Sequence, residues 1–179
     1  MIKETTLHYK TPEEIKAFQE ARLQEALAYL QEHSAFYRRM FQDNNIDISA
    51  IKSIEDLTKI PTTSKQDLQS HNADFLCVSP TDVIDYVTTS GTLGEPVTFA
   101  LTESDLQRLA YNEASSFTMT GCTKEDVMQL MTTIDRRFMA GLAYFLGARE
   151  LGTGIVRVGN GIPELQWDTI QRVKSTICV

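Results

Sequence analysis

The residues best suited to chemistry form a loop of hydroxyl and glycine residues between two apolar runs. The loop reads Thr-Ser-Gly-Thr-Leu-Gly-Glu-Pro from Thr89 to Pro96, and β-branched residues precede and follow it. Small residues let backbone N–H groups converge on phosphate oxygens, and serine and threonine hydroxyls add donors. The loop therefore favours an anion-binding role, and a polar turn joining two antiparallel strands is the alternative interpretation.

A second group of candidates follows a predicted buried strand over residues 126–131. Asp135-Arg136-Arg137 would lie at the carboxyl edge of a sheet, where ligands usually bind, and could meet a phosphate or a substrate carboxylate. An exposed helix start with Asp135 as its N-cap is the alternative. Large side chains on the following helix would either line a pocket for an aryl acid or pack in the core: Phe138, Met139, Tyr144 and Phe145.

The remaining reactive residues suggest no site of their own. The histidines share no metal-ligand spacing, so we predict no metal centre built by them: His8, His33 and His71. The cysteines are sparse and far apart, and we expect reduced, buried thiols: Cys77, Cys122 and Cys178. The acidic residues show no paired geometry, so no residue is assigned a catalytic role.

Length, composition and charge limit the kinds of protein that this chain can be. The 179 residues are 42% apolar and 23% charged, with a net charge of −7, which is typical of one globular domain. Acidity argues against a nucleic-acid surface and against a polybasic membrane contact. No apolar run approaches the roughly 20 residues needed to span a bilayer, and the N-terminus has no apolar signal core. We therefore expect a cytoplasmic protein.

Helices are expected over residues 1–80. Pro12 follows a threonine N-cap and opens an apolar stripe of helical spacing. A second helical segment covers Ser34 to Phe41, and Ser53 and Ser64 each precede an acidic residue by three positions, which is typical of helix starts. These elements form a helical lead-in to the rest of the chain.

Residues 81–179 are predicted to be α/β. The expected order is strand 83–88, strand 97–101, helix from 103 towards 119, strand 126–131, helix 136–151, strand 155–158, helix 163–174 and strand 176–179. Alternating strands and helices with short connections imply a parallel sheet with right-handed crossovers. Trp167, on the last of these helices, is expected to be a packing residue. The last strand leaves a sheet face uncovered, so we expect a fragment or a sheet completed by a partner.

The loop resembles the phosphate-binding signature of the adenylate-forming enzymes, T-S-G-T-T-G-x-P, with Leu93 where threonine is usual. Flanking segments are similar to the N-terminal region of phenylacetate–CoA ligases: Phe36-Tyr37, Ile54-Glu55-Asp56-Leu57 and Ile60-Pro61-Thr62-Thr63-Ser64-Lys65-Gln66-Asp67-Leu68. The segment from Gly141 to Gly152 is similar to that family's next helix. The resemblance runs from about Phe36 to the end of the chain.

This resemblance implies a fold and a reaction. The fold would be an incomplete N-terminal domain of an adenylate-forming enzyme over residues 1–179, with a helical N-terminal region, a small β-hairpin and a partly parallel α/β sheet. In such enzymes a carboxylate attacks the α-phosphate of ATP, and the thiol of coenzyme A then displaces AMP from the acyl-adenylate. ATP, Mg²⁺ and coenzyme A are thereby implied. The resemblance assigns ATP binding to Thr89, Ser90, Gly91, Thr92, Leu93 and Gly94.

Much of the family's catalytic apparatus has no counterpart before Val179. The adenine-contacting segment, the segment that helps to hold Mg²⁺, the ribose-binding aspartate and the C-terminal lysine cannot be placed. The resemblance thus implies an N-terminal fragment that lacks ligase activity alone and either forms a homodimer or associates with the missing half. A non-catalytic module that binds a nucleotide or a partner is the alternative. The sequence does not identify the carboxylic acid.

Overall fold

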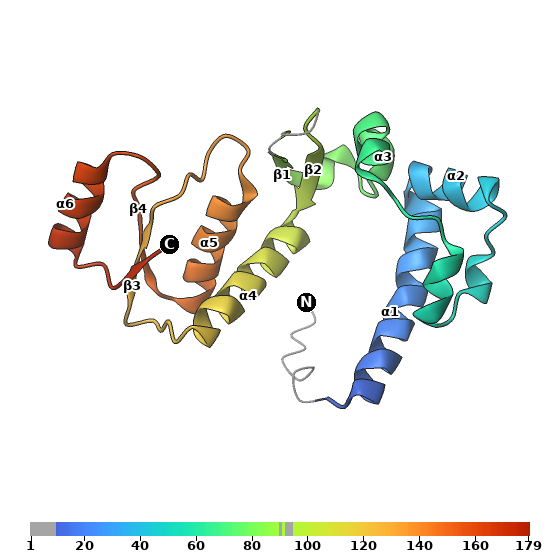
Figure 1. Cartoon of the computed structure of the whole chain (residues 1–179), viewed down its shortest axis with the longest axis horizontal. Coiled ribbons are helices and arrows are strands. Elements are labelled where there is room, and N and C mark those ends of the chain that lie inside the picture. The colour runs from blue at the N-terminus through green and yellow to red at the C-terminus, as the bar shows by residue number, and fades with distance from the viewer. Residues whose placement is uncertain (1–9, 90, 92–94) are drawn as a thin grey trace. The chain divides into compact units, whose positions relative to one another are not determined.

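The computed structural model describes residues 10–89, 91 and 95–179, which fall into two compact units divided between Pro80 and Thr81 (Figure 1). The first unit is helical, and the second combines helices, a hairpin and a parallel sheet. This confirms the predicted α/β class. Within the described residues, no helix has both the length and the apolar character that crossing a membrane requires.

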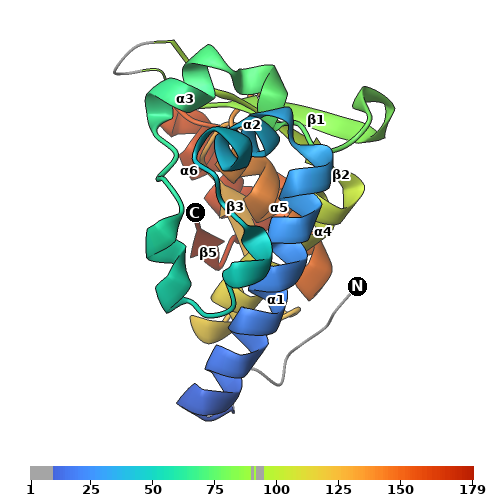
Figure 2. The ribbon, with the colours of Figure 1, turned by 90° about the vertical axis from the view of Figure 1, so that its right-hand side faces the viewer.

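The first unit is built on the long helix α1 (Pro12–His33), with α2 (Ala35–Asp43) following it directly (Figure 2). Thr11 caps α1 in a capping box with Glu14. Leu27 of α1 packs against Phe41 and Ile51 in the unit's core. The other helical elements are Ile48–Ala50, Glu55–Lys59, α3 (Lys65–Ser70) and Asn72–Phe75, of which α3 starts at the predicted Ser64 capping box.

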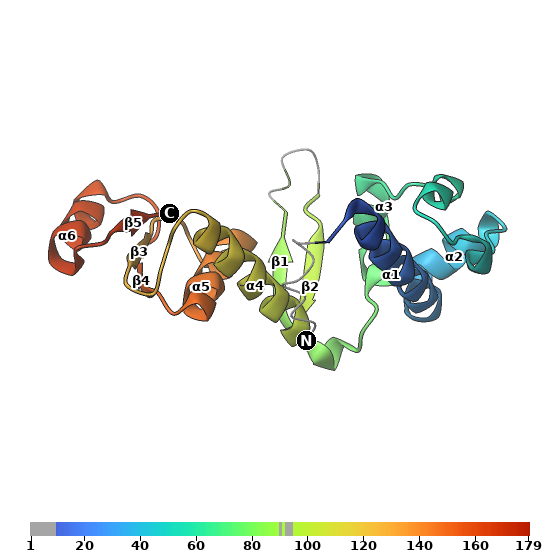
Figure 3. The ribbon, with the colours of Figure 1, turned by 90° about the horizontal axis from the view of Figure 1, so that it is seen from below.

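The second unit opens with an antiparallel hairpin, visible in Figure 3, of β1 (Val83–Thr88) and β2 (Thr98–Thr102). Val87 lies opposite Phe99 across the ladder, and directly opposed side chains share one face of the hairpin. Thr102 then caps α4 (Glu103–Met119) in a capping box with Asp105. The hairpin is thereby held at the start of the unit's longest helix.

The sheet of the second unit has three parallel strands, with β3 (Val127–Leu130) between β4 (Gly154–Arg157) and β5 (Ile177–Cys178). Met128 of β3 packs with Cys122 and Ala148 on the face covered by α4 and α5 (Met139–Leu151). Helix α6 (Pro163–Val173) lies on the opposite face (Figures 1 and 3). Side chains alternate between the two faces because a strand has a period of two.

A buried polar network fixes α6 to the central strand. The amide nitrogen of Gln129, which is fully buried, donates to the backbone oxygen of Gln166 at 3.1 Å and to its side-chain oxygen at 2.8 Å. Ser175, just after α6, donates to the Gln129 side-chain oxygen at 2.9 Å, and Gln166 donates to the carbonyl of Gly159 at 2.6 Å. Every group of this network has a partner, so its burial carries no unpaired polar atom.

Three sequence predictions are wrong in detail. The helix expected from Arg136 starts at Met139. Trp167 does not pack on the sheet, since 62% of it is exposed; its neighbour Gln166 is the residue that faces β3. Cys122 is buried as expected, but Cys178 is exposed because it lies on the short edge strand β5, and Cys77 is half-buried. Burial raises the pKa of the Cys77 thiol.

Candidate functional site

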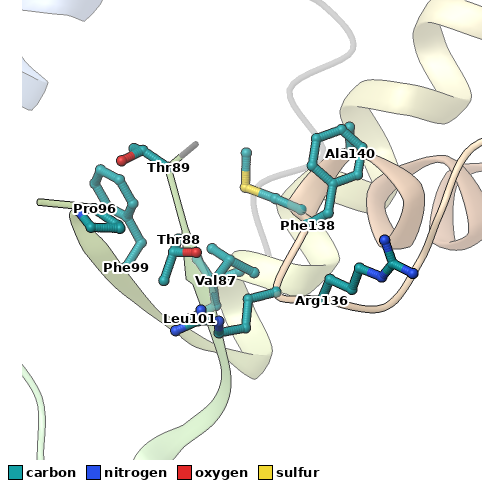
Figure 4. Close-up of a pocket in the computed structure, with 11 residues that line it drawn as sticks. Val87, Thr88, Thr89, Pro96, Phe99, Leu101, Arg136, Phe138 and Ala140 are labelled. Carbon is teal, nitrogen blue, oxygen red and sulfur yellow. The ribbon is translucent and has the colours of Figure 1, made fainter. Parts of the chain in front are cut away.

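A hollow of about 690 Å³ lies beside the base of the hydroxyl–glycine loop, within the second unit (Figure 4). Two segments line it. We call Val87, Thr88, Thr89, Pro96, Phe99 and Leu101 the hairpin wall, and Arg136, Arg137, Phe138, Met139 and Ala140 the connection wall. The volume lies in the range of pockets that hold small molecules.

Thr89 closes the hairpin at the point where the loop begins. Its backbone N–H donates to the carbonyl of Val97 at 3.0 Å, and its hydroxyl oxygen accepts from the backbone N–H of Val97, also at 3.0 Å. Val97 is only 1% exposed, so these bonds are anchored in the core. A hydroxyl that accepts one bond keeps its own proton, and Thr89 can therefore still donate to a ligand.

The phosphate-loop prediction falls partly within the described residues. Gly91 has a φ of 67°, a left-handed conformation that glycine adopts without steric cost. Ser90, Thr92, Leu93 and Gly94 lie outside the described residues. The alternative interpretation of the loop as a hairpin connection is correct, since β1 and β2 are antiparallel. A hairpin connection and an anion-binding loop are compatible, because both use small residues and free amides.

The connection wall has an irregular backbone between β3 and α5. Arg136 and Arg137 both adopt left-handed conformations, with φ of 58° and 61°. The backbone N–H of Thr88 donates to the carbonyl of Arg137 at 3.1 Å, which joins the two walls. Asp135 therefore does not cap α5; Phe138 occupies the N-cap position and supplies no side-chain hydrogen bond. Two consecutive left-handed residues cannot begin a right-handed helix, which explains its later start.

The two arginines place positive charge at the hollow. The side chain of Arg136 is 82% exposed, and its Nε lies 4.0 Å from Oδ1 of Asp135. Within the described part of the chain, the guanidinium of Arg137 has no ion pair. Figure 4 shows Thr89 and Arg136 on different sides of the hollow, with the Arg136 side chain extending outward at its rim. The hollow thus combines hydroxyl, apolar and cationic surfaces.

A glycine lets α5 lie close to Thr133, in the segment that leads from β3 into the connection wall. A methyl group at Gly141 would overlap the carbonyl group of Thr133, so only glycine permits this approach. Of the four large candidates on this helix, Phe138 and Met139 line the hollow. Tyr144 instead lies against Phe117, with ring centroids 6.1 Å apart, and Phe145 lies under Arg157.

The sequence interpretation missed the apolar part of the hairpin wall. Val87, Phe99 and Leu101 lie on one hairpin face, and the alternation within each predicted strand was the available signal. Within residues 10–89, 91 and 95–179, no cluster of three histidine, cysteine or acidic side chains has a geometry suited to a metal ion.

Comparison with known proteins finds CoA ligases among the similar sequences and folds. No family model matches the chain. It is 34% identical to the phenylacetate-coenzyme A ligase of Thermus thermophilus and 29% identical to that of Escherichia coli, each over 160 residues. Each match covers 89% of this chain but 36% of the relative, so the chain spans about a third of these relatives' length.

The fold agrees with the sequence comparison. A 2-hydroxyisobutyryl-CoA ligase, solved with 2-HIB-AMP and CoA, is 26% identical with a TM-score of 0.80, over 90% of this chain and 35% of that one. The predicted resemblance in sequence and fold is therefore confirmed, and coverage of this size fits the N-terminal portion that the motifs indicate.

Proposed function

We propose that this phenylacetate–CoA ligase-like chain supplies the phosphate-binding part of an ATP-dependent ligase that joins a carboxylic acid to coenzyme A. The observation that carries the proposal is the hollow beside the loop base, where Thr89 lines an apolar pocket and Gly91, two residues further along the loop, has a left-handed backbone. The 2-hydroxyisobutyryl-CoA ligase of the same fold was solved with an acyl-adenylate and CoA, which supports this chemistry.

The residues of the chain would act on the departing pyrophosphate. Attack of a carboxylate on the α-phosphate of ATP forms a new C–O–P linkage and releases pyrophosphate, which gains negative charge as it leaves. Donors held in advance toward that charge lower the barrier. The proposed donors are the hydroxyl of Thr89, the backbone N–H of Gly91 and the other donors of the loop that ends at Pro96. Bound Mg²⁺ would neutralise phosphate charge.

The apolar lining of the hollow would hold the body of the acid. Val87, Phe99 and Phe138 offer an uncharged surface within reach of the loop base. Placing the acid there would bring its carboxylate toward the phosphates without a long diffusive search, which is the advantage of a preformed site. The thiol of coenzyme A would displace AMP in a second step, for which we assign no residue.

The complete reaction is proposed for an assembly larger than this chain. Because the chain spans about a third of its relatives' length, we expect the chain alone to have no ligase activity, that is, neither acyl-adenylate nor thioester formation. The proposed partners are a small carboxylic acid, ATP, coenzyme A and a polypeptide that supplies the rest of a ligase, and the proposed location is the cytoplasm. ATP–pyrophosphate exchange with aryl acids tests this statement, and clear turnover by the isolated chain would refute it.

Nucleotide binding is the direct test of the phosphate site. At ten times its dissociation constant, Mg·ATP should raise the melting temperature by about 3–6 °C. Gly91→Val should abolish the rise, since valine opposes the left-handed backbone and its bulk keeps phosphate from the amides. Gly121→Val is the matched control: Gly121 has a φ of 89°, with open space around it, far from the hollow in sequence.

The outcomes separate the ligase proposal from a non-catalytic module. A rise in melting temperature that survives in Gly121→Val but not in Gly91→Val supports a working phosphate site. A chain that dimerises with rising concentration and gains no stability from Mg·ATP contradicts it and supports a module that binds partners.

A further inference from the structure

The hollow carries two cationic side chains that the adenylation chemistry described above does not use. Arg136 and Arg137 both line the hollow, whose other lining side chains are apolar except for Thr88 and Thr89. Figure 4 shows Arg136 and Thr89 on different sides of it. An apolar pocket with a cationic rim is suited to a molecule that is apolar in its body and negatively charged at its far end.

Resting on the proposed function, we propose that the acid bound in this hollow carries a second anionic group, which Arg136 and Arg137 recognise. The reacting carboxylate would point toward Thr89, and the ring or chain would lie against Phe99 and Phe138. The second carboxylate, sulfonate or phosphate would meet the guanidinium groups. The substrate class is thus an apolar acid with two negative charges.

The backbone of the connection wall supports a role for these side chains. A left-handed conformation costs a non-glycine residue roughly 1–2 kcal/mol, and two consecutive arginines adopt it here. The Thr88–Arg137 hydrogen bond involves backbone atoms, so a glycine would hold the turn equally well. The conformation therefore gives no structural reason for arginine at either position, whereas anion recognition does.

The charge balance leaves the pair able to bind an anion. Asp135 is the acidic group nearest to Arg136, at 4.0 Å, and both side chains are mostly exposed. Arg137 has no ion pair among the described residues. The nearby acidic residue of the hairpin is Asp85, which lies on the face of Val87 and Phe99, and its carboxylate accepts a hydrogen bond from the backbone N–H of Tyr86. At least one positive charge at the hollow is therefore not neutralised.

Calorimetry with two acids of the same shape tests the inference. The probes are phenylacetate, with one negative charge, and 4-carboxyphenylacetate, with two, titrated into the whole chain with and without Mg·ATP. The dianion should bind about tenfold more tightly. Arg136→Gln and Arg137→Gln should each weaken binding of the dianion by about threefold, the double variant should remove the preference, and binding of the monoanion should not change.

Two further variants control for charge and for folding. Arg108→Gln removes a similarly exposed arginine, 80% exposed on α4 and outside the hollow, and should leave both affinities unchanged. Arg136→Lys keeps the charge and should retain most of the preference. The melting temperature of each variant without ligand verifies that it is folded.

The calorimetric results can overturn this inference and the proposed function independently of each other. Equal affinity for both acids in the wild type, or a preference that persists in the double variant, overturns the inference, even if Mg·ATP stabilises the chain. A preference for the dianion that the double variant lacks upholds the inference, even if Mg·ATP has no effect and the ligase proposal fails.

Discussion

The two walls of the hollow are built on different principles. The hairpin wall follows a regular antiparallel ladder, and its last bonds join Thr89 to the buried Val97. The connection wall is irregular, with two left-handed arginines and a helix start that lacks a side-chain cap. It depends instead on one backbone bond from Thr88 and on the close approach at Gly141.

This difference separates the part of the site proposed to carry the reaction chemistry from the part proposed to carry selectivity for the acid. A regular ladder with a recognisable loop can be found from sequence, and it carries the proposed chemistry common to the relatives. An irregular connection depends on one chain's side chains and carries the proposed selectivity. Variants that act on one wall and leave the other intact test this division.

The largest expected effect is on the connection wall, at Gly141. Gly141→Ala should lower the free energy of unfolding by about 2–3 kcal/mol, because the methyl group overlaps the Thr133 backbone and must displace it. Urea denaturation measures the change. Gly154→Ala is the control, since a methyl group there makes only ordinary contacts, with Val127 and the Asp126 carbonyl oxygen, and should change stability by less than about 0.5 kcal/mol. Similar losses in both variants would contradict the close-approach explanation.

The hairpin wall should respond more weakly, at Thr89. Thr89→Val removes the acceptor for the Val97 N–H and should cost about 1 kcal/mol of stability together with part of the ATP-dependent rise in melting temperature. Thr89→Ser keeps the hydroxyl and should preserve both. If Thr89→Ser and Thr89→Val behave alike, the hydroxyl has neither function.

Substitution of the connection-wall arginines by glycine is expected to increase stability, in contrast to the two preceding changes. Arg136→Gly and Arg137→Gly should each raise the free energy of unfolding by about 0.5 kcal/mol, because glycine adopts the left-handed conformation without strain but loses more backbone entropy. The same variants should bind 4-carboxyphenylacetate less tightly. Lower stability in both variants would show that arginine is retained for folding, and the walls would then not divide chemistry from selectivity.

The smallest effect concerns the far end of β3, the strand from which the connection wall departs. Hydrogen bonds from the Thr123 backbone N–H and the Thr176 hydroxyl lower the pKa of Asp126. A lowered pKa means that the carboxylate stabilises the fold above its unfolded pKa of about 4 and that this contribution is lost as pH falls through the folded value.

Denaturation at several pH values checks this expectation. Asp126→Asn should be less stable than wild type at pH 7, and the gap should narrow below pH 4. Glu125→Gln, which removes the neighbouring exposed carboxylate, should leave the free energy of unfolding at pH 7 within about 0.5 kcal/mol of wild type. A gap that stays constant with pH would mean that the Asp126 charge does not contribute.

The sequence was informative where local rules decide the structure. The N-cap at Thr11, the helix start at Ser64 and the two strands of the hairpin follow from local features, and the structure confirms them. The predicted start of α5 was wrong because Asp135 is a favourable N-cap residue by sequence. In the structure the chain instead turns in a left-handed conformation at Arg136 and contacts β1. That contact spans about fifty residues, and no pattern in either segment reveals it alone.

The exposure of single side chains was equally hard to predict. Trp167 reads as a packing residue because it is large and apolar, yet Gln166 occupies the position that faces β3. Burying an amide there is favourable only because Gln129 is opposite, and that pairing depends on the tertiary fold. Phosphate binding at Ser90, Thr92, Leu93 and Gly94 stays a prediction.

The buried network around Gln129 has a consequence for how the molecule opens. Its bonds reach residues before, within and after α6, so that helix cannot detach without leaving a buried amide unpaired. We expect α6 and β3 to exchange their amide hydrogens with deuterium as one cooperative group, at the slow rate of the sheet core. The face of the sheet on which α6 lies would then resist proteolysis as a unit, while the edge strand β5 would open independently of it.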